Sequence, residues 1–492
     1  MEAEKRIANM EALIAHGNIA GRCAMVAILE AGLEASDPYP SIQKLIRLEG
    51  DKMIVGKKDF EPAGSPKTGD EVFDLTKIKN IYVLGAGKGI QRVAKSIEDL
   101  LGGRLTGGHV VDKKGHPVIC RKIGVTLGAH PAPDIDCVRG CEKIYQIIQG
   151  LTPDDLVFTC VSNGVSSLLT MPVPGLNIDD VSEVTHVMQI EHGATTTDLN
   201  AIRNHLDMMK GARVTRYIHQ AGAKAINILA IDPGSYRLLM YDNLWLHTLP
   251  DYTTFELALN NIKKYDAWDE ISGPVKDFLQ KANPKYESVK AAEFEKWGDR
   301  IFGLMPGYRQ TAKIWPAMKR AKELGFEAVY LNEENRSVEA RHAGTFVAGI
   351  CKTIERTGLP FEPPVALFSS GEMVVTVGKE TGIGGRNQEF CLSAAGPIAG
   401  SKNIVIGSVD TDGTDGPGTQ YGGQVEGMPD CLAGGIVDGE TMGEAKQAGL
   451  SVVEELKRHN TSPPLWKLNS AVNATPNISL IDLTVALVLK RS

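Results

Sequence analysis

The sequence lacks several features that would place it in a specialised class of protein. Its eight cysteines include no C-x-x-C pair and no companion histidine cluster, so we expect neither a disulfide framework nor a zinc site. No apolar stretch reaches the roughly 18 residues that a membrane-spanning helix requires. The first 35 residues are amphipathic and carry acidic side chains, unlike a secretory signal or a transit peptide. These absences predict a soluble cytoplasmic protein that does not enter a membrane.

A basic surface is missing as well. The formal net charge is -7 and no long Lys/Arg run occurs, which argues against a nucleic-acid partner, because neutralising phosphates requires a basic surface. Small anionic substrates are compatible with an acidic chain, since a few local cations suffice to bind them. The 492 residues, 42% hydrophobic and 23% charged, have an ordinary globular composition and can build two or three cores.

Strand-like and helix-like segments alternate along the first half of the chain. A helix is expected up to about residue 35, and a buried strand at 81–84 leads through a Gly-rich turn into a helix with one apolar face. Further strands are expected at 110–111, 125–127, 156–161 and 226–231, with helices at 138–148, 181–188 and 199–209. This alternation predicts parallel strands joined by crossover helices, in an open α/β layer structure.

The pattern changes between about residues 254 and 307, which are rich in Lys, Glu, Asp and Trp and are expected to be mostly helical. We place the domain junction there and predict an N-terminal domain of residues 1–258 and a C-terminal α/β domain of residues 259–492. In the second domain we expect strands at 328–331, 365–369, 373–377, 404–409 and 480–489, and helices at 314–324, 338–354 and 387–395.

The first motif that suggests a chemical function is Gly85-Ala86-Gly87-Lys88, between a strand and a helix. Such a turn presents backbone N–H groups and a positive dipole end, which favour an anion, and Lys88 adds a full charge. The spacing fits neither a P-loop nor a dinucleotide fingerprint, whose third small residue is replaced by Ile90. A tight turn with a solvated lysine is the alternative.

Two further motifs offer groups that bind phosphates or carboxylates. Ser162, Asn163, Gly164 and Ser166 follow a buried strand, where their hydroxyl and N–H groups suit an anion; ordinary N-capping is the alternative. Asn200, Arg203 and Lys210 are expected on roughly one side of a helix, and an arginine can hold a carboxylate with two hydrogen bonds. A solvated polar face is the other reading of that helix.

The last two motifs lie in the second half. Gly384-Gly385-Arg386-Asn387 opens an apolar helix, and two glycines before Arg386 let a ligand approach the backbone, although Asn387 also suits an N-cap. Asp410, Asp412 and Asp415 follow a strand in the loop D-T-D-G-T-D-G. Their carboxylates are suited to Mg²⁺ on nucleotide phosphates, and equally to turn formation.

Together, in this order, the motifs resemble those of the glycerate 2-kinase family. The matching series is GAGK, S-x-G-x-S, N-x-x-R-x-H-L with KG, GE with TV, GGRNQE and TDGTDGP. The resemblance covers nearly the whole chain and implies a Rossmann-like open parallel sheet in the N-terminal domain. It implies a C-terminal domain that contains a MOFRL region at about 365–492, with the active site in the interdomain cleft.

The resemblance implies transfer of the ATP γ-phosphoryl group to the 2-hydroxyl of D-glycerate, a small hydroxy acid. Its proposed catalytic lysine and arginine correspond to Lys88 and Arg386, one from each domain. Phosphoryl transfer requires charge positioning more than covalent chemistry. The expected phosphate or substrate ligands are Gly85, Gly87, Ser162, Asn163, Gly164, Ser166, Asn200, Arg203, Lys210, Gly385 and Asn387. Glu372 and the Asp410, Asp412 and Asp415 loop are alternatives for holding Mg²⁺ or for accepting the hydroxyl proton, and a homodimer is left open.

The chain departs from the family pattern in loops expected around the substrate. Asn163 and Val165 replace glycines, residues 246–249 replace a family S-G-P-T, and the closing motif keeps Asp482 but loses its glycines. Residues 231–235 keep only part of the corresponding family motif, and about a dozen residues at 420–432 are inserted relative to the family pattern. A larger or differently decorated hydroxy acid would account for these changes. An NAD(P)-dependent hydroxypyruvate-type reductase, with Asp112 as its ribose-binding acid, and a non-catalytic metabolite-binding protein are the alternatives.

Overall fold

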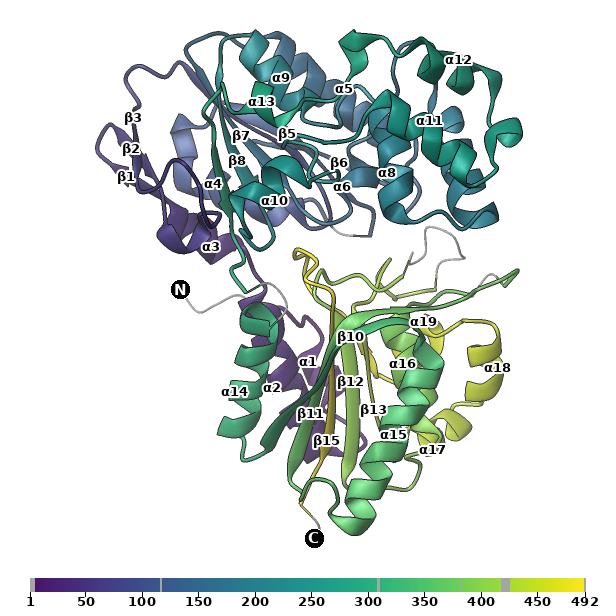
Figure 1. Cartoon of the computed structure of the whole chain (residues 1–492). Helices are drawn as coiled ribbons and strands as arrows, with labels where there is room; N and C mark the ends of the chain where they lie inside the picture. Colours follow the sequence, from purple (N-terminus) through teal and green to yellow (C-terminus); the bar gives the residue numbers. More distant parts are fainter. Residues whose placement is uncertain (1–4, 116, 308–309, 381, 417–424, 491–492) are drawn as a thin grey trace. The chain divides into compact units, whose positions relative to one another are not determined.

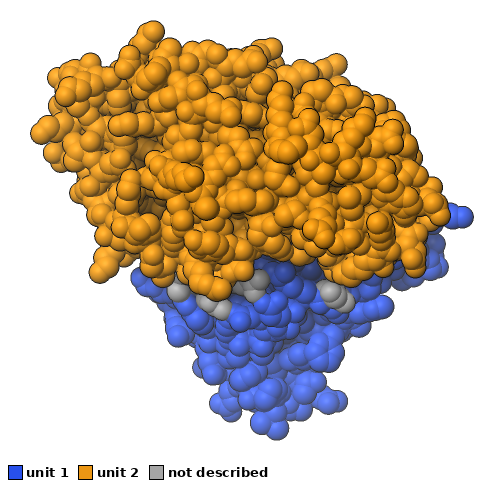
Figure 2. All heavy atoms as spheres, turned by 45° about the horizontal axis from the view of Figure 1, so that its top comes forward, with its two compact units in different colours: residues 1–37, 115–117, 307–492 blue, residues 38–114, 118–306 orange. Residues whose placement is uncertain are grey.

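A computed structural model of the chain describes residues 5–115, 117–307, 310–380, 382–416 and 425–490. The chain divides into two compact units, which are coloured separately in Figure 2. Unit 1 comprises residues 1–37, 115–117 and 307–492, and unit 2 comprises residues 38–114 and 118–306. This division differs from the predicted junction at 258/259 in two ways: residues 259–306 belong to unit 2, and the N-terminal residues group with the C-terminal half.

Unit 2 is built on a sheet of six parallel strands in the order β6-β5-β4-β7-β8-β9 (Figure 1). The strands are β4 (Asn80–Ala86), β5 (Gly107–Lys113), β6 (Gly124–Gly128), β7 (Asp155–Val161), β8 (Lys224–Leu229) and β9 (Arg300–Gly303). The five predicted strands of this half are confirmed, and β9 is an additional short edge strand. The chain runs outward from β4 in one direction and then from β7 in the other. This is the strand order of doubly wound sheets, in which ligands bind where the order reverses.

The helices of unit 2 follow the predicted alternation. They are α3 (Tyr39–Leu45), α4 (Ile90–Leu101), α5 (Ile135–Gln149), α6 (Val165–Leu168), α7 (Ile178–Thr185), α8 (Thr196–His205), α9 (Arg213–Gln220), α10 (Tyr236–Tyr241), α11 (Phe255–Lys264), α12 (Gly273–Lys281) and α13 (Ala291–Phe294). A small antiparallel sheet of β1 (Ile46–Glu49), β2 (Lys52–Val55) and β3 (Glu71–Asp74) precedes them and was not predicted. None of the described helices of the chain is both long and apolar enough to cross a membrane.

Unit 1 contains a mixed sheet in the order β10-β11-β15-β12-β13-β14. Its strands are β10 (Glu327–Glu339), β11 (Val365–Val374), β12 (Ile404–Asp410), β13 (Gly434–Asp438), β14 (Ala471–Val472) and β15 (Asp482–Val488). Its helices are α1 (Met10–Leu13), α2 (Ile19–Ala35), α14 (Trp315–Glu323), α15 (Ala340–Thr357), α16 (Arg386–Ala395), α17 (Thr441–Gln447), α18 (Val452–Lys457) and α19 (Ser462–Lys467). The two strands predicted at 365–369 and 373–377 form the single strand β11, because Ser370 and Gly371 continue its pairing with β15.

Helices cover both faces of the unit 1 sheet (Figure 1). Side chains alternate along β15: Val485 and Leu487 join one core with α2 and α14, while Ala486 and Val488 join the other with α15 and α16. Because both faces are buried, the strand reads as a continuous apolar run. Residues of α2 are therefore part of the C-terminal core, which explains why the chain divides before residue 38 as well as at 306/307.

Candidate active site

Lys88 lies at the point where the strand order of the unit 2 sheet reverses. It follows β4 directly, and Ser162 and Asn163 follow the neighbouring strand β7. The Lys88 N–H donates to the Asn163 carbonyl at 2.8 Å, and the Ser162 hydroxyl donates to the Lys88 carbonyl at 2.9 Å. The structure therefore brings the first two predicted motifs together, through hydrogen bonds that involve the main chain of Lys88 and not its ammonium group.

The glycines of these loops are required by close contacts within the protein, since a side chain at each would clash with a neighbouring residue. A Cβ on Gly85 would lie 2.1 Å from the Cys160 carbonyl oxygen, and one on Gly87 would lie 2.1 Å from the Ser162 Oγ. Gly164 has a φ of +82°, and a Cβ there would lie 2.9 Å from the Lys88 Cγ. These positions require glycine because two loops and a lysine stem share a small volume.

Asp112 occupies the N-terminus of α4, where an anionic ligand was expected. Its carboxylate accepts hydrogen bonds from the N–H groups of Gly89, Gln91 and Lys113, at 2.8, 3.2 and 2.7 Å. Burial raises the pKa of Asp112 to about 6, although the backbone N–H groups act to lower it. A carboxylate fully buried in this position does not reach a ribose, which removes the residue on which the reductase alternative depended.

Ser166 contacts a residue that the sequence did not single out. Its Oγ lies 2.9 Å from His247 Nε2, and His247 is buried. Burial, with the charges of Lys210, Arg203 and Arg213, holds the pKa of His247 well below the ordinary histidine value. His247 is therefore a neutral polar group beside the β7 loop. The one signal for it in the sequence was that residues 246–249 depart from the family pattern.

The third predicted motif separates into two parts. Arg203 Nη2 donates to Asn200 Oδ1 at 2.6 Å, so these two residues act together. The helix expected to run to residue 209 ends at His205, and Lys210 lies beyond it. Lys210 is fully buried and its Nζ lies 2.6 Å from Asp207 and 2.8 Å from Thr170 Oγ1. We correct the predicted helical face accordingly: Lys210 lies in the turn after α8, although its charge and that of Arg203 are close enough to act on each other.

In unit 1, Arg386 lies among three carboxylates at one end of the central strands of the sheet. Asp482 at the start of β15 pairs with Asp410 at the end of β12 and with Gly371 of β11, which precedes Glu372. Arg386, the first residue of α16, places its Nε 2.8 Å from Asp482 and its Nη2 2.7 Å from Asp410. Its Nη1 lies 3.9 Å from Glu372.

These contacts keep Arg386 charged within the cluster. Burial acts to lower the pKa of Arg386, but Asp482 and Asp410 outweigh it and raise the pKa well above the ordinary value. Asp482, which the sequence reading noted only as retained, is a principal partner.

The four residues predicted to bind metal do not form one ligand set. Asp415 caps α16 by accepting the N–H groups of Asn387 and Gln388, at 3.1 and 2.9 Å. A Cβ on Gly385 would lie 2.3 Å from the Asp415 Cγ, so this glycine admits the cap. Asp412 accepts the N–H of Thr414 within its own loop. Within the described ranges, no group of three or more His, Cys, Asp or Glu residues is arranged to hold a metal ion. The inserted stretch at 420–432 lies partly, at 420–424, outside the described residues.

Two protein-family models match the chain. The model described as a domain of unknown function, DUF4147, covers residues 24–280, and that of the MOFRL family covers residues 365–479. The chain belongs to the glycerate kinase family. This membership confirms the resemblance seen in the motifs, in the predicted order along the chain.

Members of the family from several organisms resemble this chain over most of its length. A glycerate 2-kinase of Pyrococcus horikoshii is 28% identical, with 92% of this chain and 94% of that protein covered. A D-glycerate 2-kinase of Thermotoga maritima is 29% identical, with 88% and 96% covered. The crystal structure of the Thermotoga maritima glycerate kinase matches with a TM-score of 0.66 at 26% identity, covering 95% of this chain and 99% of that one. A putative hydroxypyruvate reductase of Agrobacterium vitis is 29% identical over 81% of this chain and 85% of its own length.

Proposed function

We propose that this family member transfers the γ-phosphoryl group of Mg·ATP to the 2-hydroxyl of D-glycerate or a related small hydroxy acid. The observation that carries the proposal is the cluster of Arg386 with Glu372, Asp410 and Asp482 at one end of the central strands. Phosphoryl transfer requires a fixed cation for the charge on the phosphoryl oxygens and a carboxylate to take up the proton of the attacking hydroxyl. The cluster contains both groups.

The residues of the cluster differ in what they can do. Asp410 and Asp482 are buried and bound to Arg386, whereas the side chain of Glu372 is 48% exposed. We assign Glu372 as the base: the substrate oxygen bonds to the γ-phosphorus, the bond to the bridging oxygen breaks, and the hydroxyl proton passes to the carboxylate. Lys88 and Arg386 are assigned to the transferring phosphoryl oxygens, and ADP leaves with the bridging oxygen.

Arg203 is the best candidate for holding the carboxylate of the acid. Its guanidinium is buried, it bonds to neutral Asn200, and its Nε has no hydrogen-bond partner among the described residues. Burial lowers the pKa of Arg203 to about 10, so it stays charged at neutral pH. The charge of Asp207 acts on Arg203, but among the described residues no carboxylate forms an ion pair with its guanidinium. A buried guanidinium with an unused N–H is a fitting partner for an organic acid.

Replacing Arg203 with lysine should therefore weaken binding of the acid more than it slows chemistry. An ammonium cannot reproduce two parallel hydrogen bonds to a carboxylate. We expect the KM for the acid to rise about tenfold or more, with kcat within a fewfold and the KM for ATP unchanged. Steady-state kinetics with each substrate varied in turn tests this, and Arg216→Lys, which alters a partly exposed arginine paired with Glu293, is the control. An unchanged KM for the acid would remove Arg203 from the substrate site.

The function itself is tested by measuring ADP release from Mg·ATP in the presence of a panel of C3 to C6 hydroxy acids. We expect ADP in stoichiometric amount with a phosphorylated acid, and phosphorus NMR identifies the oxygen that is modified. If no acid stimulates ADP release, the kinase assignment is wrong for this chain. Oxidation of NADH by hydroxypyruvate would instead support a reductase, which the capping role of Asp112 disfavours.

A further inference from the structure

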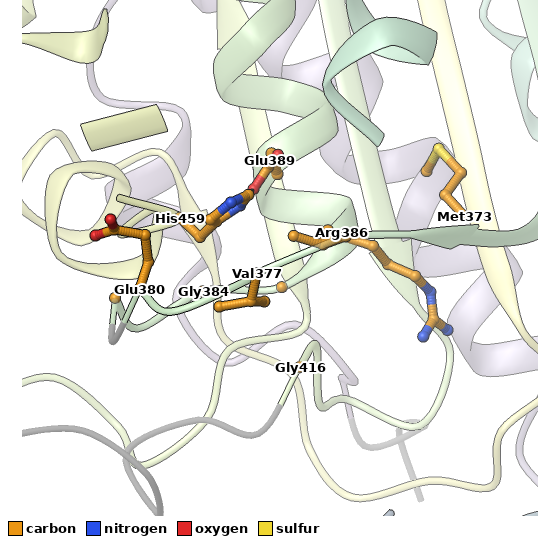
Figure 3. A pocket seen from close by; sticks show the side chains of 11 residues that line it. Met373, Val377, Glu380, Gly384, Arg386, Glu389, Gly416 and His459 are labelled. Carbon is orange, nitrogen blue, oxygen red and sulfur yellow. The ribbon is translucent and has the colours of Figure 1, made fainter. Parts of the chain in front are cut away.

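A pocket of about 450 Å³ lies in unit 1 beside Arg386 (Figure 3). It is lined by Met373, Val375, Val377, Glu380, Gly382, Gly384, Gly385, Arg386, Glu389, Gly416 and His459. This volume falls within the range of small-molecule sites. None of the reaction steps assigned above uses the pocket apart from Arg386.

One side of the pocket is apolar. Met373, Val375 and Val377 supply aliphatic and thioether surface, and the methionine sulfur is polarisable enough to favour contact with an aromatic ring. Glycines 382, 384, 385 and 416 bring the backbone up to the cavity without side chains. A flat, largely apolar group fits such walls better than a compact group rich in hydroxyls.

The inner polar residues of the pocket are already satisfied by one another. Glu389 is buried, and its carboxylate lies 2.6 Å from Arg341 Nε and 2.9 Å from His459 Nδ1. Arg341 also donates to the Leu456 carbonyl at 2.8 Å. These bonds fix the wall of the pocket and leave it without an uncompensated charge that would attract a small anion.

Arg386 joins the pocket to the carboxylate cluster. It is the only Lys or Arg among the described residues that line the cavity, and its guanidinium binds Asp410 and Asp482. Figure 3 shows its guanidinium extending away from His459 and Glu389. A ligand with an apolar part in the pocket would therefore present its polar end to the groups assigned to phosphoryl transfer.

We propose that this pocket binds the nucleobase of the ATP that serves as phosphoryl donor, an inference that rests on the proposed kinase function. A three-carbon hydroxy acid has no apolar face to place against Met373 and Val377. The other common place for a nucleotide, the first helix of the doubly wound sheet, is capped by Asp112. The base therefore belongs to the MOFRL-containing unit, and not to the sheet of unit 2.

The test compares two valine-to-tryptophan variants of the full chain. Val377 lines the pocket and is 40% exposed, whereas Val374 is 41% exposed and does not line it. Both positions tolerate a larger side chain at the surface, and only Val377→Trp should fill the cavity. We expect Val377→Trp to weaken ADP binding at least tenfold, measured by calorimetry without any acid present. Binding of tripolyphosphate and the KM for the acid should stay unchanged, and Val374→Trp should bind ADP like the wild type.

A measurement on the wild type makes the test independent of any variant. Adenosine should compete with ADP for binding, whereas ribose 5-phosphate should compete poorly. If the wild type turns over ATP but Val377→Trp binds ADP normally, the pocket assignment is wrong and the kinase function stands. A rise in the KM for the acid in Val377→Trp, with ADP binding unchanged, would show that the pocket holds the acid instead. If the wild type neither binds ADP nor releases it from ATP, both proposals fail.

Discussion

Replacing Lys88 with alanine should reduce turnover by a factor of about 10² to 10³ or more, the usual cost of removing one preorganised group from charge developing in a transition state. The fold should survive, because Lys88 holds the two loops through its N–H and carbonyl groups, which alanine retains. We therefore expect an unchanged circular dichroism spectrum together with the loss of activity.

Lys95→Ala is the matched control for this experiment. Lys95 lies on α4, directly after the loop, and pairs with Glu98 and Asp99 near the surface. Its loss removes one lysine charge from the helix that follows the Lys88 loop but should leave turnover near normal, since Lys95 is bound to Glu98 and Asp99 and takes no part in the assigned reaction. Near-normal turnover in Lys88→Ala would show that the lysine is only part of a tight turn, the alternative that the sequence alone left open.

Replacing Arg386 with alanine should have two separable effects. It removes the guanidinium that contacts both Asp410 and Asp482, two buried carboxylates that are adjacent on neighbouring strands. Breaking such a buried pair costs about 3–5 kcal/mol, so the melting temperature should fall. Turnover should fall by two or more orders of magnitude as well, because the guanidinium is assigned to the phosphoryl oxygens.

A second substitution distinguishes the two effects. Arg386→Ala combined with Asp482→Asn removes one of the stranded charges, so it should regain part of the lost melting temperature. It should not regain turnover. If turnover returned with stability, Arg386 would have only a structural role.

Combining Lys88→Ala with Arg386→Ala tests the predicted joint action of the two cations. If both residues serve one chemical step, the double variant should lose little more turnover than either single variant, whereas independent effects on turnover would multiply.

The sequence predicted the elements with strong periodicity and missed those defined by distant contacts. The β4 strand, its turn and α4 are local patterns, and the structure places them within a few residues of the predicted positions. The antiparallel strands β1 to β3 are four residues long and gave no such signal. Lys210 was placed on a helix by spacing alone, but its pairing with Asp207 and Thr170 belongs to a turn.

The candidate site was predicted in part for the same reason. Arg386 stood out because two glycines and a polar run open its helix, a feature visible in one stretch of sequence. The partner Asp482 lies almost a hundred positions later in an apolar strand, and only the pairing of β15 with β12 and β11 brings it to Arg386. The sequence could not show that aspartates close in the chain make different contacts: Asp415 caps α16, whereas Asp412 accepts an N–H within its own loop.

The packing of α2 on the C-terminal sheet has a consequence for how the protein is made. During synthesis α2 emerges early, whereas β12 and β15, which cover its apolar face, emerge only after all of unit 2. At ordinary rates of translation the interval is on the order of tens of seconds. Met25, Ile28 and Leu29 have no core partner from the C-terminal half until α14 emerges, by which time all strands of the unit 2 sheet have been synthesised, and β12 and β15 follow later still. The nascent chain therefore carries α2 with part of its apolar face uncovered after unit 2 has been synthesised. The last strand to be synthesised, β15, completes the core that covers this face.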